Sequence, residues 1–244
     1  KAIFANKLNI FDLNFLKMIK EIISFYKNAP FLLKKNLDGE TLGSYLDKSN
    51  FSKYLIEYHI IPMVAAIWSM PLNKAREMPL ELYLNFFINH GLFKLKDRPQ
   101  WYTVSSRSRT YVKKVLENVS GEIFKNYKVN KISRSNDNVR ISIGDEYLDY
   151  DHVILASHAD QSLKMLENPT DDEIRILSKF EYVSNSAILH TDEELMPKKK
   201  LAWSSWNSIS KGNKTCVTYW LNNLQNLKCK DDFFLTLNPI FPNI

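Results

Sequence analysis

The spacing of the apolar residues changes once along the chain, and this change restricts the fold more than any other feature. Up to residue 118 apolar residues recur every three or four positions, which is typical of amphipathic helices. The pattern predicts helices over 10–26, 51–68, 79–89 and 108–118. Beyond residue 120 the apolar runs are short and separated by turn residues, which indicates strands. These strands are expected over 128–133, 139–143, 146–149, 183–190, 202–206, 215–221 and 233–237, with a helix over 171–178.

The predicted helices carry signals at their ends and at their interruptions. In the first helix we expect one packed face that contains Leu13, Leu16, Ile19, Ile22 and Ile23. Thr41 opens a short helix that Gly43 weakens. Pro62 is expected to kink or break its helix, because proline has no amide hydrogen to donate. Gly91 is expected to close the helix that Pro79 starts.

A continuous apolar run predicts a different kind of strand over 151–156. The run Asp151-His152-Val153-Ile154-Leu155-Ala156 does not alternate, so we expect a strand buried on both faces, followed by a helix over 160–166. A buried strand that leads into a helix indicates a parallel sheet of the α/β type. The complete order is a helical part, a small β/α unit and an antiparallel sheet, which places the chain in the α+β or α/β class.

The six glycines are too far apart to form a phosphate-binding turn. Such a turn needs glycines close together where a strand leads into a helix, as in GxGxxG. HExxH, GxSxG and a paired-carboxylate signature are also missing from the sequence, so motifs assign no catalytic residue. Cys216 and Cys229 form no CxxC and have no histidine cluster beside them. They argue against a zinc site or a disulfide scaffold and fit a reducing compartment, so we expect no metal.

The basic residues are numerous but scattered. The formal net charge is +6, and Lys198-Lys199-Lys200 is the single lysine run of the sequence. Beside Pro197 it is interpreted as a solvated turn rather than a phosphate or lipid-headgroup patch. Basic and aromatic residues do not interleave as in RNA-binding proteins, so no nucleic-acid partner is expected. The longest apolar stretch, 60–68, is too short to span a membrane.

Several polar and aromatic residues have both a structural and a functional interpretation. Asn89 and His90 end a helix, where a histidine caps the helix or lines a site. His59 lies in an apolar helix and is interpreted as a hydrogen-bonded core histidine. His158 follows the predicted buried strand, at the edge where α/β folds bind nucleotides. The aromatic residues Trp203, Trp206, Tyr219 and Trp220 form either the core of the sheet or one wall of a flat apolar pocket.

Several longer segments of the sequence resemble one known family. The segments that carry the resemblance are residues 58–69 (YHIIPMVAAIWS), 86–92 (FFINHGL), 97–101 (DRPQW), 153–161 (VILASHADQ), 189–192 with 195–197, 202–207 (AWSSWN), 217–220 (VTYW) and 236–239 (TLNP). In this order they are similar to the flavin-dependent amine oxidase superfamily, and within it to the bacterial branch described as predicted NAD/FAD-binding oxidoreductases. The resemblance covers nearly the whole chain from Ala29 onward.

The resemblance implies a two-domain flavoprotein with a discontinuous FAD-binding domain and an inserted substrate domain. The chain then corresponds to an internal fragment, because the GxGxxG segment precedes this region in the family and because the chain begins at Lys1 rather than Met. The implied domains are 1–120, the mainly helical part of the substrate domain; 121–166, a partial FAD-binding domain; and 167–244, the antiparallel sheet of the substrate domain. Alone, the fragment is expected to be inactive and poorly soluble.

The same resemblance implies the site residues. Those near FAD are Val129, Ala156, Ser157 and His158, and those near the substrate are Asn89, His90, Trp101, Trp206 and Tyr219. Ser106-Arg107 stands where relatives often have Gly-Gly, which would permit positive φ or a close approach to the flavin.

The implied activity is FAD-dependent hydride removal from a small or lipid-like substrate. Relatives of this branch are often encoded beside cyclopropane-fatty-acid-synthase-like methyltransferases, so we hypothesise a lipid or fatty-acyl substrate rather than a soluble amine. The sequence names no electron acceptor. We expect a cytoplasmic protein, with contact to the inner face of the membrane as a further option. The alternative is a non-catalytic binding module whose basic surface recruits acidic lipid or nucleic acid.

Overall fold

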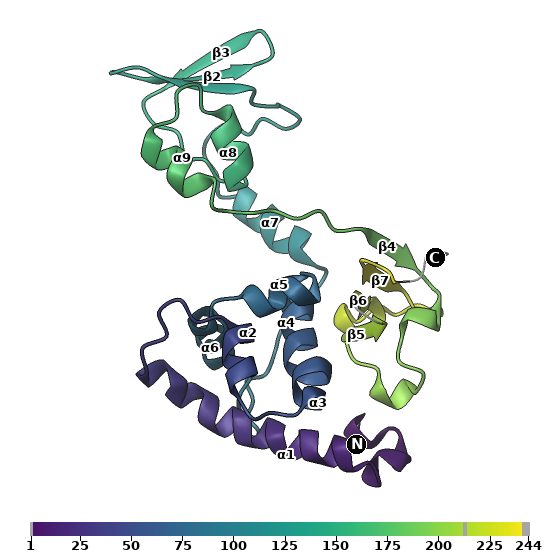
Figure 1. Cartoon of the computed structure of the whole chain (residues 1–244). Coiled ribbons are helices and arrows are strands. Elements are labelled where there is room, and N and C mark those ends of the chain that lie inside the picture. Colours follow the sequence, from purple (N-terminus) through teal and green to yellow (C-terminus); the bar gives the residue numbers. More distant parts are fainter. Residues whose placement is uncertain (1, 212–213, 241–244) are drawn as a thin grey trace. The chain divides into compact units, whose positions relative to one another are not determined.

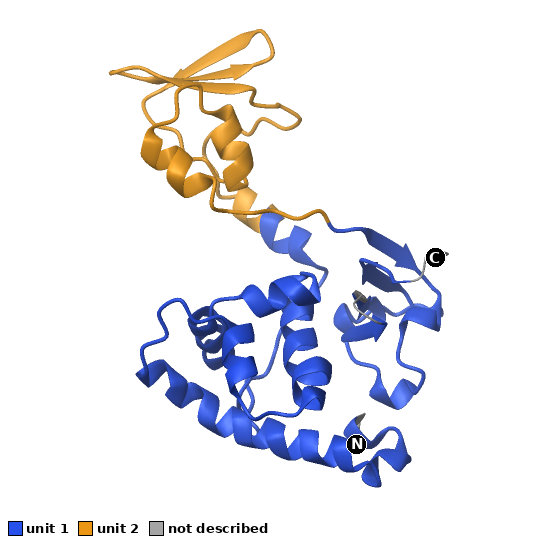
Figure 2. Ribbon diagram, viewed as in Figure 1, with its two compact units in different colours: residues 1–112, 185–244 blue, residues 113–184 orange. Residues whose placement is uncertain are grey.

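The computed structural model in Figure 1 describes residues 2–211 and 214–240. The chain divides into two compact units (Figure 2). Unit 1 comprises Lys1–Val112 and Asn185–Ile244, and unit 2 comprises Lys113–Ser184, which is inserted between the two parts of unit 1. These boundaries differ from the implied ones, which lie after residues 120 and 166. The extent of a cofactor-binding domain stays a prediction.

Most of the helices belong to unit 1. Its α-helices are α1 (Leu13–Asn28), α2 (Leu42–Lys48), α3 (Lys53–Leu55), α4 (Ile61–Trp68), α5 (Leu72–Glu77), α6 (Leu80–Asn89) and α10 (Leu221–Leu224). Its other helical turns are η1 (Ala2–Phe4), η2 (Lys7–Ile10), η3 (Ala29–Lys34), η4 (Ile56–Ile60), η5 (Glu193–Leu195) and η6 (Lys200–Ala202). Helix α7 (Ser108–Leu116) spans the boundary between the units. No helix in the described part of the chain has the length and apolar character needed to cross a membrane.

The core of unit 1 is an aromatic and aliphatic cluster between its helices. Phe25 of α1 and Tyr83 and Phe87 of α6 are each about 1% exposed. The rings of Tyr83 and Phe87 lie 4.2 Å apart between centroids, and those of Phe25 and Tyr83 lie 6.4 Å apart. Buried rings contribute large apolar areas and edge or offset contacts, so this cluster fixes how α1 and α6 pack.

Helix α1 presents a different face to the core from the one expected. Phe15, Met18, Ile19, Ile22, Phe25 and Tyr26 pack inward. Of the predicted face, Leu13 is 80% exposed, Leu16 38% and Ile23 39%. Ile19 and Ile22 pack inward as expected, but Leu13, Leu16 and Ile23 do not, because the larger aromatic and methionine side chains one step around the helix bury more apolar area.

Pro62 changes the helix that contains it, as expected. The segment 53–68 is α3, then a π-helical turn, η4, and then α4, in which Pro62 occupies the first turn. A proline inside an α-helix cannot donate to the carbonyl four residues earlier and clashes with it. The wider π turn before Pro62 accommodates that loss without ending the helix.

Gly43 has a packing role that its weak helix propensity does not reveal. A Cβ at Gly43 would lie 2.9 Å from the carbonyl oxygen of Arg76 in α5. Helix α2 is stabilised instead at its start, where Thr41 and Ser44 form a reciprocal capping box. The glycine therefore permits a close approach of α2 to α5.

The second part of unit 1 forms a four-stranded antiparallel sheet in the order β4-β7-β6-β5. The strands are β4 (Ala187–His190), β5 (Trp206–Lys211), β6 (Lys214–Trp220) and β7 (Phe234–Leu237). Thr218 and Thr236 are directly opposite in β6 and β7, fully buried, and their hydroxyls lie 2.8 Å apart. On either side of this pair, His190 Nε2 lies 2.7 Å from Thr236 Oγ1, and Asn207 Nδ2 donates to the Thr218 carbonyl at 3.3 Å.

The strand predicted over 202–206 lies further along the chain. A turn occupies the predicted position: Asn207 Oδ1 accepts from the Ser204 amide, and Asn207 Nδ2 donates to the Ser204 carbonyl. Such side-chain bonds compete with strand pairing, so β5 begins only at Trp206.

Unit 2 contains the antiparallel sheet β1-β2-β3 and two helices. Its elements are β1 (Lys131–Arg134), β2 (Val139–Ile143), β3 (Glu146–Tyr150), α8 (Ala159–Met165) and α9 (Asp171–Leu177). Ile132 and Ser162 are the buried residues among those described in this unit. A unit of this size that folds by itself normally buries a larger core.

The expected strand over 151–156 is not formed. The segment has no strand assignment, and no described strand pairs with it. Ile154 is 93% exposed, so the expectation of burial on both faces was also wrong. A strand buried on both faces needs neighbouring strands and covering helices, and the described residues of unit 2 do not supply them.

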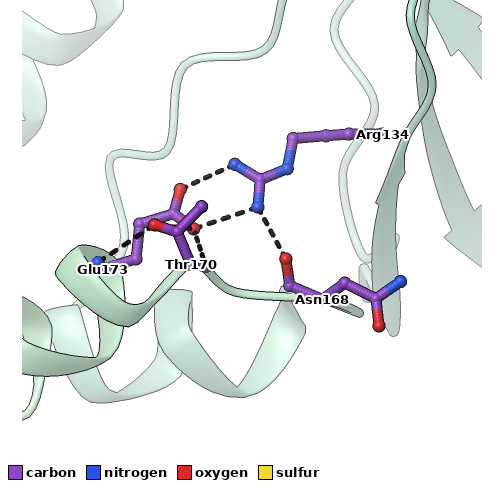
Figure 3. A network of polar contacts seen from close by, with 4 residues as sticks. All are labelled: Arg134, Asn168, Thr170 and Glu173. Carbon is purple, nitrogen blue, oxygen red and sulfur yellow. Dashed lines mark hydrogen bonds and ion pairs between the residues drawn. The ribbon is translucent and has the colours of Figure 1, made fainter.

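A network around Arg134 connects β1 to α9 (Figure 3). The Arg134 guanidinium donates to both carboxylate oxygens of Glu173, at 2.7 and 2.9 Å, and to the Asn168 carbonyl at 2.8 Å. Glu173 also accepts from the Thr170 amide as part of the capping box of α9. Hydrogen bonds from Arg134 and then from Thr170 lower the pKa of Glu173 from 4.5 to about 2.

We predict that Phe87→Ala destabilises the chain by about 3–5 kcal/mol, because the side chain is fully buried and leaves a cavity. Leu82→Ala, on the same helix with a 52% exposed side chain, is the control and should change stability by less than about 0.5 kcal/mol. Urea unfolding measures both. Equal losses would contradict the assigned orientation of α6.

We predict that Arg134→Gln raises the pKa of Glu173 from about 2 toward its usual 4.5. Because the folded pKa lies below the unfolded one, the network stabilises the fold above about pH 4.5, and this contribution is lost as the pH falls toward 2. NMR titration of the Glu173 carboxyl carbon measures the shift. Arg175→Gln, which removes an ion pair to Asp172 on the same helix, should leave the pKa of Glu173 near 2.

Candidate functional site

A cavity of about 490 Å³ in unit 1 lies between the η4–α4 segment and the sheet. Glu57, Tyr58, His59, Pro62, Met63, Ala66 and Ile67 line it from the helical side, and Trp206, Asn207, Ser208, Ser210 and Val217 line it from the sheet. Its volume falls within the range of small-molecule sites, and its lining is mostly apolar with a few polar groups. The cavity therefore has the size and chemistry to hold a small organic ligand.

The π turn supplies three consecutive residues to this cavity, Glu57, Tyr58 and His59. In a regular α-helix three consecutive residues span about 200° of the circumference. All three nevertheless line the cavity, and π turns occur frequently at functional sites.

His59 is a neutral imidazole held by Tyr26. Its Nε2 lies 2.8 Å from the Tyr26 hydroxyl, which also lies 3.9 Å from the sulfur of Met63. Burial, and to a lesser extent the positive charge of Arg98, lowers the pKa of His59 from 6.5 to about 4. Burial also raises the pKa of Tyr26. At neutral pH the pair is uncharged, so it orients a polar group at the cavity without adding charge.

The structure brings together Trp206 and Tyr219, the two candidates on the sheet. They are directly opposite in the first register pair of β5 and β6, and their rings meet edge to face with centroids 5.4 Å apart. Trp206 is 49% exposed and forms part of the cavity wall. Tyr219 supports Trp206 from the side and does not line the cavity itself.

The other substrate candidates form a separate aromatic stack at the end of α6. The ring of His90 lies 4.0 Å from that of Phe86 and 6.0 Å from that of Trp101, nearly parallel to both. His90 Nδ1 lies 2.8 Å from the Phe86 carbonyl oxygen, so His90 acts as a helix cap. Asn89 is exposed.

Gly91 allows the backbone conformation that this aromatic stack requires. Its φ is +63°, and a Cβ there would lie 2.8 Å from Cδ of Pro99. A residue with a side chain would be strained by the positive φ and would push Pro99 away. The glycine thus lets the 98–101 segment fold back so that Trp101 covers His90. No contact in the described residues joins this stack to Trp206 or Tyr219.

Unit 2 contains the four residues that were predicted to lie near FAD. Val129 is half-buried and lies two residues before β1, and Ala156, Ser157 and His158 are exposed. Ser157 Oγ lies 2.8 Å from Ser162 Oγ at the edge of a hollow of about 590 Å³. The hollow is walled mainly by apolar side chains, among them Ile132, Val153, Leu155, Ile176 and Phe180.

Tyr182 positions the segment around His158 and was not identified from the sequence. The two rings are parallel, with centroids 4.4 Å apart, and the Tyr182 hydroxyl accepts from the Ala159 amide at 2.9 Å. Tyr26 was missed in the same way, whereas the interpretation of His59 as a hydrogen-bonded histidine is confirmed. Both tyrosines lie more than 20 residues from their partners, so local spacing contains no signal for either pair.

Ser106 and Arg107 both adopt positive φ, at +63° and +73°. Residues with a Cβ are strained in this region, and glycine is not. The turn before α7 therefore has the backbone geometry that a Gly-Gly pair would favour, although the sequence has Ser-Arg there.

Comparison with known families matches residues 86–224 to the family described as flavin containing amine oxidoreductase. The match extends from α6 to α10 and includes the whole of unit 2, so it covers well over half of the chain. All nine candidate residues named from the sequence lie within it. No curated protein matches the chain.

We predict that the stability of the chain falls between about pH 6.5 and pH 4 because His59 titrates. The folded pKa lies below the unfolded value, so the unfolded chain binds the proton first, and stability present above pH 6.5 is lost as the pH falls toward 4. The loss attributable to His59 is roughly 3 kcal/mol. Urea unfolding at several pH values should show a shallower pH dependence for His59→Gln. His152→Gln, at an exposed histidine, should retain the original dependence.

Proposed function

The chain belongs to the family of flavin-containing amine oxidoreductases, and we propose that it forms part of an FAD-dependent enzyme that removes a hydride from a small or lipid-like substrate. The observation that carries the proposal is the family match over residues 86–224, which includes unit 2 and the strands that line the cavity. Bound oxidised flavin supplies a hydride acceptor, and the protein orients and encloses the substrate.

We assign the substrate to the cavity between η4–α4 and the sheet. Trp206 gives it a flat aromatic wall, and Met63, Ala66, Ile67 and Val217 give it an apolar lining. His59 adds one uncharged polar group whose orientation Tyr26 fixes. The mostly apolar lining supports a substrate with an apolar body, as in the lipid or fatty-acyl class, and Glu57, Asn207, Ser208 and Ser210 add further polar groups for its polar end. His90 and Trp101 form a second aromatic surface, which we propose contacts substrate or flavin.

The described residues could form one part of an FAD site but not its phosphate-binding part. The segment of Ala156 and Ser157 is exposed and outside any strand, so its backbone groups are accessible to a ligand, and His158 is held in place by Tyr182. We propose that Val129, which the family resemblance places near FAD, lies beside the adenine. A pyrophosphate cradle is lacking: the sequence has no glycine-rich turn, the Ala159 amide is occupied by Tyr182, and Asp160 places a carboxylate in the first turn of α8. We therefore propose that the phosphate contacts come from polypeptide outside this sequence.

The small core of unit 2 also supports the proposal that polypeptide outside this sequence completes the FAD site. Its exposed apolar residues include Ile154 at 93%, Phe180 at 56% and Val183 at 61%. The hollow beside β1 and α9 is apolar and open. Contiguous exposed apolar surface is unfavourable in water. It is explained if the chain is an internal piece of a flavoprotein whose remaining FAD-binding segments cover unit 2. On this proposal the piece is inactive alone and acts in the cytoplasm, with the electron acceptor still to be identified.

The proposal predicts that the complete gene product contains bound FAD and that Trp206 is needed for substrate oxidation. Trp206→Ala should retain the flavin absorption spectrum but slow anaerobic flavin reduction by substrate by about 10- to 100-fold, because a misplaced substrate loses alignment. Tyr147→Ala, at an exposed aromatic residue of unit 2 outside both cavities, should leave the rate unchanged.

Two outcomes decide between the candidate functions. A product that binds no FAD when purified with added cofactor contradicts the oxidoreductase proposal and favours the non-catalytic binding module. Bound flavin that is reduced by amines and not by acyl lipids contradicts the lipid substrate class alone.

A further inference from the structure

The positive charge of the chain is concentrated at its beginning. Residues 1–36 contain seven lysines and two carboxylates, which gives a formal net charge of +5 out of the +6 of the whole chain. Arginine is absent until Arg76. The region that contains η1, η2, α1 and η3 is therefore a lysine-only cationic surface, and it lies outside the residues that match the family.

The outward face of α1 combines these lysines with exposed aliphatic side chains. Leu13, Leu16 and Ile23 are exposed, and Lys17, Lys20 and Lys27 are exposed on the same side of the helix. These six positions follow helical spacing opposite the face that packs on the core. Lys17 lies 3.9 Å from Glu21, whereas the structure gives no ion pair within its described residues for Lys20 or Lys27.

The same surface continues into the turn before α1. Leu8 of η2 is 72% exposed, and Phe11, next to the N-cap Asp12, is 82% exposed. Exposed apolar side chains of this size are normal when single. A group of them next to one another, interspersed with lysines, indicates a surface that leaves water when it binds a partner.

We propose that the outward face of α1, together with Leu8 and Phe11, binds the surface of an anionic lipid bilayer. Leucine, isoleucine and phenylalanine enter the boundary between headgroups and acyl chains, while lysines on the same face extend to the headgroup phosphates. The charges are complementary, because a cationic strip of lysines meets an anionic leaflet. This inference does not rest on the flavin chemistry.

Other partners suit this surface less well. Nucleic-acid sites favour arginine for planar, bidentate phosphate contacts, and aliphatic side chains between the lysines would contribute nothing to phosphate binding. The centre of a protein–protein interface is depleted of lysine, whereas here lysines alternate with leucine and isoleucine across the whole face. A bilayer accommodates both kinds of side chain at once.

Sedimentation with sucrose-loaded vesicles tests the proposal on the full 244-residue chain. We expect binding to phosphatidylcholine vesicles that contain about 30 mol% phosphatidylglycerol and little binding to pure phosphatidylcholine. Raising the salt from about 0.1 M to about 0.5 M should weaken the binding, because the Debye length shortens.

Two variants separate the charged from the apolar contribution. The triple variant K17Q/K20Q/K27Q should lower the partition coefficient about 100-fold, at about fivefold for each lysine. The double variant F11S/L13S should lower it on the same vesicles. The triple variant K113Q/K125Q/K179Q, which removes the same charge from exposed lysines elsewhere, is the control and should bind like the original chain. Circular dichroism checks that each variant folds.

Several outcomes would overturn the proposal. These are no binding to anionic vesicles, equal loss in the control variant, or binding that F11S/L13S leaves unchanged. Tighter binding to a single-stranded oligonucleotide than to vesicles would assign the face to nucleic acid. A dimer in light scattering that F11S/L13S dissociates, without vesicle binding, would assign it to a second copy of the chain.

Discussion

The missing amide hydrogen of Pro62 is the constraint on which the candidate site depends. An α-helix cannot continue unchanged past it, and the chain responds with the π turn η4 rather than a break. Glu57, Tyr58 and His59 of that turn line the cavity. The aromatic cluster of α1 and α6 then holds Tyr26 where its hydroxyl meets His59. The π turn before Pro62 and the Tyr26–His59 contact together shape the helical side of the cavity.

The two units differ in what holds them together. Unit 1 has a continuous buried cluster, so packing determines its helix arrangement. Unit 2 relies on its sheet, two short helices and polar connections such as Arg134–Glu173. Exposed ion pairs contribute little net stability, and among the described residues of unit 2 only Ile132 and Ser162 are buried.

Much of the fold could be predicted from local pattern, and the failures have physical causes. Where apolar residues recur with clear helical spacing and the helix has clear end signals, the predicted bounds were confirmed almost to the residue. Helix α6, which Gly91 follows, is an example. The face of α1 was predicted only in part, because aromatic side chains bury more area than the exposed Leu13, Leu16 and Ile23 would, and β5 begins later than predicted because of the turn that Asn207 forms with Ser204. In the candidate site, the pair of Trp206 and Tyr219 could be anticipated, because both lie in predicted strands. The contacts of Tyr26 and Tyr182 could not, because nothing local encodes a partner more than 20 residues away.

The insertion of unit 2 has a consequence for how the chain is made. Strand β4 starts at Ala187, and its sheet is completed only by β7 at Phe234–Leu237. During synthesis helices α1–α6 of unit 1 and the whole of unit 2 leave the ribosome before any strand of this sheet exists. The apolar helical side of the cavity is therefore exposed to solvent until β5 and β6 have been synthesised. Transiently exposed apolar surface makes a chain vulnerable to aggregation, so pairing of β5 with β6 protects the chain as well as completing the cavity wall.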